Sequence, residues 1–525
     1  MKSKKRNWLK LSLQGGTLLA IVAFILYGIF FGEQRADPEA YCPFGGLQAI
    51  GSYLHNNSLA CSMSMAQIMM GVVLAVGVIL FSKLFCGYLC PLGTIGEYLG
   101  KGGRKLKMNF DLKPGGIADR GLRIVKYGLL FVVFYMSVSS SELFCKNFDP
   151  YYAMATGFKG EITAWMTSIS IVLLFLGSFF IKMFWCKYIC PLGALSNIFK
   201  FTITFVGLLL LFWLLGWAGL PSAWVWALGA ACLIGYLYEM IYLRSKVFPL
   251  LRIVRDAESC NGCGSCTKKC PYHIDLKELK TVRHIDCTLC GDCVSSCPKG
   301  SLQVGGKKSL RWLPGILTIV LFVLALILGN QWELPTIDER WGNTEQVGEM
   351  KTFEMEGLTS IKCYGSSKAF SAKMQKVPGV YGVKTFVKRH AVVISYDPAQ
   401  TNEDKIREVI FIPTIMKFSN PEPQVDSVEV LTLGVDKLFD RMDMVYFGNI
   451  LKQIPGIYGF DAEYSCPVTV KLYADPSAEL SEKLLKDSIE VEQTHMLAAG
   501  GKVRWFPVDY KLVSYERNGD RISSR

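Results

Sequence analysis

Residues 260–271 read CNGCGSCTKKCP, and residues 287–298 read CTLCGDCVSSCP. Both follow the pattern C-x2-C-x2-C-x3-C-P, in which three thiolates surround one face of an iron–sulfur cube, the fourth goes to a partner cube, and the proline turns the chain away. The pattern predicts two [4Fe–4S] clusters with exchanged ligands: Cys260, Cys263, Cys266 and Cys297 for one, and Cys287, Cys290, Cys293 and Cys270 for the other. Zinc is the alternative, but tetrahedral zinc usually takes two separated C-x2-C pairs. Such clusters carry single electrons, so we expect a protein that handles electrons.

The composition indicates long apolar spans joined to soluble parts, because 51% of the 525 residues are hydrophobic while 57 are basic and 44 are acidic. The net charge of +13 would suit nucleic-acid binding, but the basic residues lie largely beside apolar stretches, where they orient a membrane protein. None of the five histidines lies in an apolar stretch, which argues against haem held between helices by paired histidines. No catalytic carboxylate pair, nucleophile–base pair or phosphate loop stands out.

About seven stretches reach the roughly 20 apolar residues that a helix needs to cross a bilayer. They are residues 13–31, 64–84, 123–141, 163–185, 201–219, 222–243 and 311–330. The first is interpreted as a retained anchor, since no small-residue cleavage site follows it. The connection 86–121 is rich in Lys and Arg, whereas the connection 32–62 carries only Arg35. Basic loops stay in the cytoplasm, so the N-terminus and the cysteine runs are expected on the cytoplasmic side of a bacterial inner membrane, and everything after residue 331 in the periplasm.

A duplication lies within the apolar part, because FCGYLCPLG at 85–93 returns as WCKYICPLG at 185–193. Such repeats pack around a pseudo-symmetry axis, with sites where the halves meet. Cysteines four residues apart share one face of a helix. We therefore expect a further redox metal centre at the cytoplasmic membrane boundary, held by Cys86, Cys90, Cys186 and Cys190. The alternative is that each C-P merely ends a helix and the thiols pack as small apolar groups.

Other cysteines leave several possibilities open. Cys42 and Cys145 open the corresponding outer loops of the two halves. There they are expected to form a disulfide, to ligate a metal or to remain free thiols. Cys61 is also expected outside, and Cys232 is expected only to pack within its span.

C-x3-C-P at the ends of spanning helices, followed by a two-cluster ferredoxin segment, resembles the membrane polyferredoxins. These include the membrane subunits that serve nitrate and nitrous oxide reductases, and the cytochrome oxidase accessory protein. The resemblance covers residues from about 40 to 300. It implies electron transfer between a quinone pool or a cytoplasmic donor and a membrane or periplasmic acceptor, or reduction and delivery of copper for oxidase assembly. Lys268, Lys269 and Lys299 would attract an acidic ferredoxin or flavodoxin, or form a solvated face.

The tail resembles a different family, the heavy-metal-associated domains of copper chaperones and transport ATPases. GLT at 357–359, PGV at 378–380 and VVISYDP at 392–398 match its landmarks, and PGI at 455–457 and VTVKLYADP at 468–476 repeat two of them. The resemblance implies an α+β tail of two ferredoxin-like βαββαβ units, at 345–420 and 425–515. Before it we expect a membrane domain at 1–250, the ferredoxin domain at 251–305 and a seventh transmembrane helix at 306–332.

That family grips Cu(I) with the two soft thiolates of a C-x2-C loop. Here the loop offers one thiolate, Cys363, with Ser360 or Ser366 at the other position, and no cysteine falls in the second copy's loop at 434–442. Cys466 precedes a strand and is expected to be structural. The tail is therefore interpreted as a docking module that lost the metal, or as a copper site in which Cys363 pairs with a partner thiolate or with Cys42.

Overall fold

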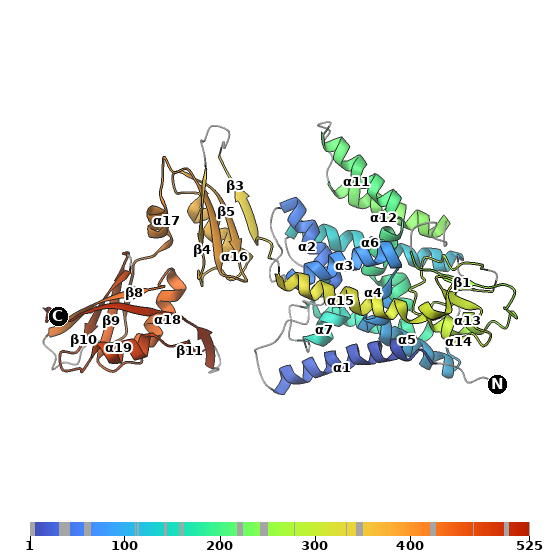
Figure 1. The fold of residues 1–525 in the computed structure, drawn as a ribbon, viewed down its shortest axis with the longest axis horizontal. Helices are drawn as coiled ribbons and strands as arrows, with labels where there is room; N and C mark the ends of the chain where they lie inside the picture. The colour runs from blue at the N-terminus through green and yellow to red at the C-terminus, as the bar shows by residue number, and fades with distance from the viewer. Residues whose placement is uncertain are drawn as a thin grey trace. The chain divides into compact units, whose positions relative to one another are not determined.

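The computed structural model describes residues 6–30, 42–56, 65–110, 112, 115–140, 144–156, 158, 162–217, 224–241, 250–277, 279–331, 333–342, 350–419, 427–465, 467–497 and 503–523. The chain divides into two compact units, Met1–Glu333 and Leu334–Arg525, which are described separately (Figure 1). Cys61, Cys466 and Arg35 lie outside the described residues.

The first unit is mainly helical. Its helices and helical turns are α1 (Trp8–Phe30), α2 (Pro43–Asn56), α3 (Met65–Phe81), α4 (Leu84–Tyr88), α5 (Pro91–Lys105), α6 (Ile117–Ser140), η2 (Phe144–Asn147), α7 (Pro150–Ala155), α8 (Ala164–Val172), η3 (Leu173–Gly177), α9 (Ser178–Phe180), η4 (Trp185–Ile189), α10 (Pro191–Lys200), α11 (Thr202–Trp217), α12 (Trp224–Ile241), α13 (Ser265–Lys269), α14 (Asp292–Ser296), η5 (Lys308–Trp312) and α15 (Leu313–Gln331). Each apolar stretch expected from the sequence falls on one or more of these helices.

Among the residues that the structure describes, four helices are long and apolar enough to cross a membrane: Trp8–Tyr27, Ile117–Ser139, Trp224–Ile241 and Leu310–Gln331. A fifth candidate is the pair Pro191–Lys200 and Thr202–Leu215, which is bent by 91°. Met65–Phe81 and Ala164–Phe180 are apolar but shorter. Large apolar side chains such as Leu19 and Trp213 are exposed on these helices, as lipid-facing residues are. The chain is thus a membrane protein, and the number seven for its spans stays a prediction.

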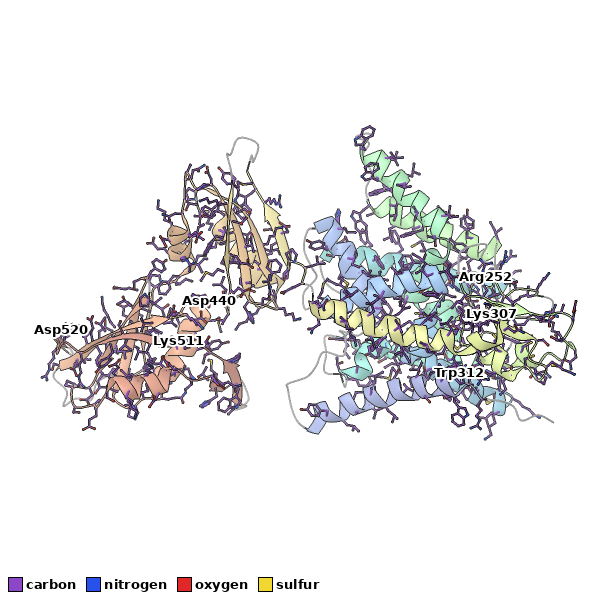
Figure 2. All side chains as sticks on the ribbon, in the orientation of Figure 1. Arg252, Lys307, Trp312, Asp440, Lys511 and Asp520 are labelled. Atoms are coloured by element: carbon purple, nitrogen blue, oxygen red, sulfur yellow. The ribbon has the colours of Figure 1, made fainter. Side chains whose placement is uncertain are left out.

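The ferredoxin segment packs onto the helical part of the first unit. Its two ends pair through the antiparallel strands β1 (Ile253–Arg255) and β2 (Leu302–Val304). Its buried side chains share one core with α4, so segment and helices form one body. Arg252, Lys307 and Trp312 lie where the segment meets the start of α15 (Figure 2). Basic and aromatic residues at such a helix start are typical of a membrane–water interface.

The described residues of the second unit form two antiparallel sheets and a separate hairpin. The first sheet has the order β3-β5-β6-β4, the second has the order β13-β8-β10-β9-β7 with β14 also on β8, and β11 pairs with β12. The strands and helices are β3 (Ile337–Arg340), β4 (Lys351–Met355), α16 (Tyr364–Met374), β5 (Val380–Phe386), β6 (Ala391–Tyr396), α17 (Glu403–Ile410), β7 (Thr414–Lys417), β8 (Ser427–Asp436), α18 (Arg441–Leu451), β9 (Ile457–Glu463), β10 (Val468–Ala474), α19 (Glu482–Ile489), β11 (Gln493–Leu497), β12 (Val503–Pro507), β13 (Lys511–Glu516) and β14 (Arg521–Ser523).

The first copy keeps the expected order of elements, β4-α16-β5-β6-α17-β7, but its last strand lies in the other copy's sheet. β7 pairs antiparallel with β9, with Thr414 opposite Ala462 and Lys417 opposite Gly459. In its own sheet, β3 takes the edge beside β5. A strand edge offers unpaired backbone groups to any neighbouring strand, and β9 supplies the edge that β7 uses.

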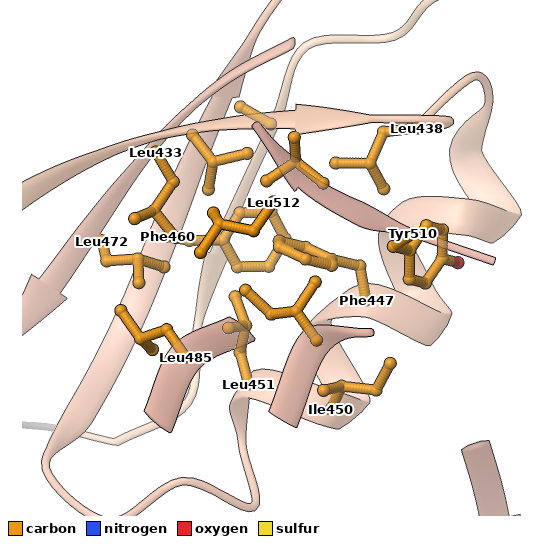
Figure 3. Packing of buried hydrophobic residues seen from close by; sticks show 14 of the residues in the cluster. Leu433, Leu438, Phe447, Ile450, Leu451, Phe460, Leu472, Leu485, Tyr510 and Leu512 are labelled. Atoms are coloured by element: carbon orange, nitrogen blue, oxygen red, sulfur yellow. The ribbon is translucent and has the colours of Figure 1, made fainter. Parts of the chain in front are cut away.

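The second copy has the larger core of the tail. Leu433, Phe447, Phe460 and Leu472 are completely buried between its sheet and helices (Figure 3). The strands alternate inward and outward residues, as β10 does from Val468 to Ala474. Burying such a side chain contributes about 1.5–3 kcal/mol each, so this core stabilises the second copy.

Candidate functional site

The first predicted ligand set surrounds one cavity. Cys260, Cys263, Cys266 and Cys297 all line it. Gly262 and Gly264 have left-handed backbones, both with φ of 67°, which glycine adopts without strain. This conformation turns the chain tightly around the thiols. Cys263 is exposed, and hydrogen bonds from the Gly262 backbone and the Arg255 side chain lower the pKa of Cys260.

The second predicted set surrounds another cavity, which lies deeper. Cys270, Cys287, Cys290 and Cys293 line it. Burial raises the pKa of Cys270 to about 11 and also raises the pKa of Cys287. Thiols that are this buried need a cation or a metal to become thiolates. Four thiols around each cavity fit a [4Fe–4S] cluster, and the structure brings together the two sets predicted from the crossed pattern. Such a cluster, when bound, stores and releases one electron.

In both halves the second cysteine of the C-x3-C-P motif is extended and precedes a new helix, which is not the arrangement expected. Cys86 lies in α4 and Cys186 in the π-helical turn η4, while Cys90 and Cys190 are extended residues that precede α5 and α10. Each C-P therefore begins a helix, because proline is well tolerated at the first helical position. The paired cysteines do not share one continuous helix face.

Glycine is required at the end of both motifs, at Gly93 and Gly193, for the same structural reason. A Cβ atom at Gly93 would lie 2.9 Å from the carbonyl oxygen of Cys86, and one at Gly193 would lie 2.9 Å from that of Cys186. No larger residue fits without moving the backbone that carries the first cysteine. The repeated PLG thus holds the two cysteines of each half close together.

Both motifs open onto one cavity of about 520 Å³. Six cysteines line it: Cys42, Cys86, Cys90, Cys145, Cys186 and Cys190. The structure therefore adds the two cysteines expected in outer loops to the four of the motif. None of the six is in a disulfide. Within the described residues, no three Cys, His, Asp or Glu side chains converge closely enough to hold a single metal ion.

The rest of this thiol cavity, as we call it, is mostly apolar, with Phe85, Phe148 and Phe322 in its wall. Trp185 also lines it, and its buried indole N–H has no hydrogen-bond partner within the described part of the chain. A buried donor without a partner costs about 1–3 kcal/mol. The donor set itself, four soft thiols of the two motifs within an apolar wall, fits an iron–sulfur centre.

Tyr272 connects the second ferredoxin site to the thiol cavity. It follows Cys270 and Pro271, and it lines both cavities. Its side chain lies near Cys186, which lines the thiol cavity as well. One side chain thus forms part of the wall of two adjacent candidate redox sites.

The backbone that carries the second set is held by side chains from the helices. Lys200 Nζ donates to the carbonyl oxygens of Ile285 at 2.6 Å and Cys287 at 3.0 Å. Ser82 Oγ donates to Cys287 O at 2.7 Å, and Asn7 Nδ2 donates to Cys290 O at 2.7 Å. These contacts fix the ligand loop to the membrane part.

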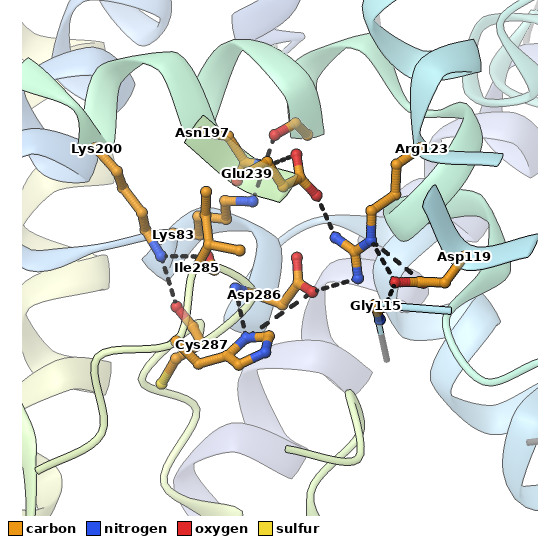
Figure 4. Close-up of polar contacts among 12 residues, drawn as sticks. Lys83, Gly115, Asp119, Arg123, Asn197, Lys200, Glu239, Ile285, Asp286 and Cys287 are labelled. Carbon is orange, nitrogen blue, oxygen red and sulfur yellow. Dashed lines mark hydrogen bonds and ion pairs between the residues drawn. The ribbon is translucent and has the colours of Figure 1, made fainter. Parts of the chain in front are cut away.

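A buried ionic network continues this contact (Figure 4). Arg123 on α6 binds Asp286 of the ferredoxin segment at 3.0 Å and also pairs with Asp119 and with Glu239 of α12. Lys126 pairs with Glu239 at 2.7 Å. The sequence offered a signal for these residues, because ionisable side chains within apolar stretches are expensive and usually functional, but it did not indicate their partners.

In the tail, residues of the candidate metal loop form hydrogen bonds with one another and with the second copy. Cys363 precedes α16 and is half-buried. Ser366 Oγ accepts from Cys363 N at 3.0 Å, and Ser360 N donates to Asp440 Oδ2 at 2.6 Å. The positions that would carry a second thiolate thus hold serines with structural contacts, and one of them binds the start of the second copy's α18.

Comparison with known proteins agrees with this geometry. Residues 63–109 and 163–202 match a 4Fe-4S binding domain family, and residues 252–298 match a 4Fe-4S dicluster domain family. The putative electron transport protein YccM of Escherichia coli is 30% identical over 257 residues, which are 48% of this chain and 58% of that protein. The regulatory protein NosR of Stutzerimonas stutzeri is 34% identical over 127 residues, 23% of this chain and 17% of NosR. The ferredoxin-type protein NapH of Haemophilus influenzae is 31% identical over 119 residues, 22% of this chain and 38% of NapH.

The chain thus covers less than two thirds of each of these relatives. The N-terminal soluble domains of Bacillus subtilis CopA match 33% of this chain and 99% of that structure, with 18% identity and a TM-score of 0.13. A score this low carries no weight for the tail.

Proposed function

We propose, from the place of this chain among membrane polyferredoxin-type 4Fe-4S proteins, that it carries electrons along a line of three iron–sulfur centres. The first would be held by Cys260, Cys263, Cys266 and Cys297, the second by Cys270, Cys287, Cys290 and Cys293, and the third by Cys86, Cys90, Cys186 and Cys190. The observation that carries this order is Tyr272, which lines both the second cavity and the thiol cavity.

The first centre is the one that a soluble donor would reach. Cys263 is exposed, whereas Cys293 is buried. Lys268, Lys269 and Lys299 are exposed beside the first cavity, and such a basic surface attracts an acidic ferredoxin or flavodoxin. In the proposed orientation this surface faces the cytoplasm and the tail faces the periplasm.

The electron acceptor would bind at the thiol cavity. Its volume of about 520 Å³ is within the usual range for small-molecule sites. Ile21 on α1 and Phe322 on α15 contribute to its apolar wall, which would suit a quinone from the bilayer. A membrane or periplasmic redox protein is the other acceptor. In that case the tail, as two heavy-metal-associated-like copies, would serve as its docking module.

The test counts the centres in anaerobically purified full-length protein. Redox-poised electron paramagnetic resonance and iron analysis should show three cubane centres. In the double variant Cys86→Ser/Cys186→Ser, one centre and its iron should be lost while the two ferredoxin signals remain. Cys232→Ser is the matched control, because this buried cysteine lies in α12 and does not line the thiol cavity.

Unchanged iron in the double variant would remove the third centre from this scheme. Copper reduction or delivery is the second candidate function, and the observation that favours it is the gathering of six soft thiols in one cavity. Copper in place of the third cubane in the wild-type protein would favour that function.

A further inference from the structure

Two buried ammonium groups near the second ferredoxin site and the thiol cavity form no ion pair with a carboxylate of the described residues. The buried carboxylates Asp119, Glu239 and Asp286 all pair with Arg123, and Lys126 also pairs with Glu239. Asp149 lines the thiol cavity. Lys83 and Lys200 are buried as well, and a buried charge without a counter-charge is costly, so these two groups call for negative charge from another source.

Lys83 is the first of these two ammonium groups. It is 5% exposed, it lines the thiol cavity, and its ammonium donates to the carbonyl oxygen of Gly193 at 3.3 Å. No carboxylate within the described ranges forms an ion pair with it. It comes from the first half of the duplication, and its hydrogen bond reaches the PLG turn of the second half, so it spans the junction between the two C-x3-C-P motifs.

Lys200 is the other. It is 7% exposed, and its ammonium binds the carbonyl oxygens of Ile285 and Cys287. No carboxylate in the described part of the chain pairs with it either. Lys200 therefore contacts the backbone of a predicted ligand of the second ferredoxin site (Figure 4), and Lys83 lines the thiol cavity.

We propose that Lys83 and Lys200 are fixed counter-charges of the two buried iron–sulfur centres, and that they raise the reduction potentials of these centres so that electrons move inward from the exposed one. This inference rests on the proposed function. A cubane with four thiolates is an anion, and each electron that it accepts from the exposed ferredoxin centre adds one negative charge while that centre loses one. No bond or proton has to move in this exchange.

The direction in which each reduction potential shifts follows from burial and charge. Cluster potentials depend on net charge, on hydrogen bonds to sulfur and on solvent exposure. Burial alone disfavours the more negative, reduced state, so the second and third centres would be harder to reduce than the exposed first one. A nearby buried ammonium stabilises the reduced state more than the oxidised state, because the attraction grows with the negative charge of the centre. Lys83 and Lys200 therefore favour inward flow.

The test is a redox titration of the full-length protein followed by electron paramagnetic resonance. In Lys83→Met, the reduced-to-oxidised ratio of the third centre at a fixed potential should fall at least tenfold, which is about 59 mV for one electron. In Lys200→Met the same fall is expected for the second centre. Lys83→Arg should keep the wild-type value, and Lys105→Met, which removes an exposed lysine of α5, is the matched control.

Each outcome is decisive. A third centre that is present in Lys83→Met with an unchanged potential, and a second centre unchanged in Lys200→Met, would overturn the proposal. If Lys83→Met loses the third centre, retention in Lys83→Arg shows that the charge is required, and loss in both variants contradicts a counter-charge role. Absence of a third centre from the wild-type protein would instead defeat the proposed function, before any variant is made.

Discussion

Tyr272 is the residue on which the proposed order of centres depends. Its side chain lies near Cys186 and forms part of two cavity walls. A hydrogen bond from its hydroxyl to a ligand sulfur would stabilise the reduced, more negative state of a cluster. The contributions of the hydroxyl and of the ring are therefore separable by substitution.

In Tyr272→Phe, we expect the third centre to become harder to reduce by roughly fivefold, since a hydrogen bond contributes about 1 kcal/mol. The first ferredoxin centre should be unaffected, and redox-poised electron paramagnetic resonance measures both. Tyr98→Phe, at an exposed residue of α5, serves as control. Equal shifts of all centres in Tyr272→Phe would contradict the local role of the hydroxyl.

Asp443 gives the tail a pH dependence. Burial and the neighbouring Asp440 raise its pKa to about 7, although the backbone N–H groups of Phe439 and Asp440 and the Thr359 hydroxyl donate to it. The folded tail therefore holds this proton more tightly than the unfolded chain does. Its stability falls as pH rises from the unfolded pKa near 4 through the folded value, and is constant above it.

For residues 334–525, we expect the free energy of unfolding to be about 2–3 kcal/mol higher at pH 5 than at pH 8 on account of this group. Denaturant titrations at the two pH values measure it. Asp443→Asn should remove the difference, and Asp487→Asn, an exposed site on α19, should keep it. A larger stability at pH 8 than at pH 5 in the unmodified tail would contradict the assignment.

At the scale of elements, α6 and α12 are joined by charges and not only by apolar packing. Glu239 of α12 is completely buried and forms ion pairs with Lys126 and Arg123. The hydroxyl of Tyr127 also donates a hydrogen bond to its carboxylate at 2.6 Å. Arg123 carries the connection on to Asp286 of the ferredoxin segment. The position of the ferredoxin segment against the helices therefore depends on a few ion pairs.

Glu239→Ala should destabilise the first unit by about 3–5 kcal/mol, because it leaves buried cations without a partner. Thermal loss of the iron–sulfur absorbance in detergent measures this effect. Glu239→Ala combined with Lys126→Met should cost less than the sum of the two single changes. Lys105→Met, an exposed change, should cost under 1 kcal/mol. Additive losses in the double variant would show that the network does not act as a unit.

At the scale of the whole molecule, local and long-range features were predictable to different degrees. Cysteine spacing predicted which four thiols line each ferredoxin cavity. Short turns gather three of the four, and the fourth comes from the other run through the exchange that is typical of this motif. The spacing did not predict that Cys42 and Cys145 join the thiol cavity, since that depends on how distant helices pack. The sheet that β7 joins could not be predicted either. Strand alternation specifies which face of a strand is buried, but not which sheet edge the strand pairs with.

The pairing of β7 with β9 also has a consequence for how such a tail can be divided. Repeat comparison would divide the tail between residues 417 and 427, yet the strand before that point is hydrogen-bonded into the sheet after it. Neither copy can be transplanted alone without an orphan strand or a bare sheet edge. The two copies therefore form one structural unit, which would have to be grafted whole.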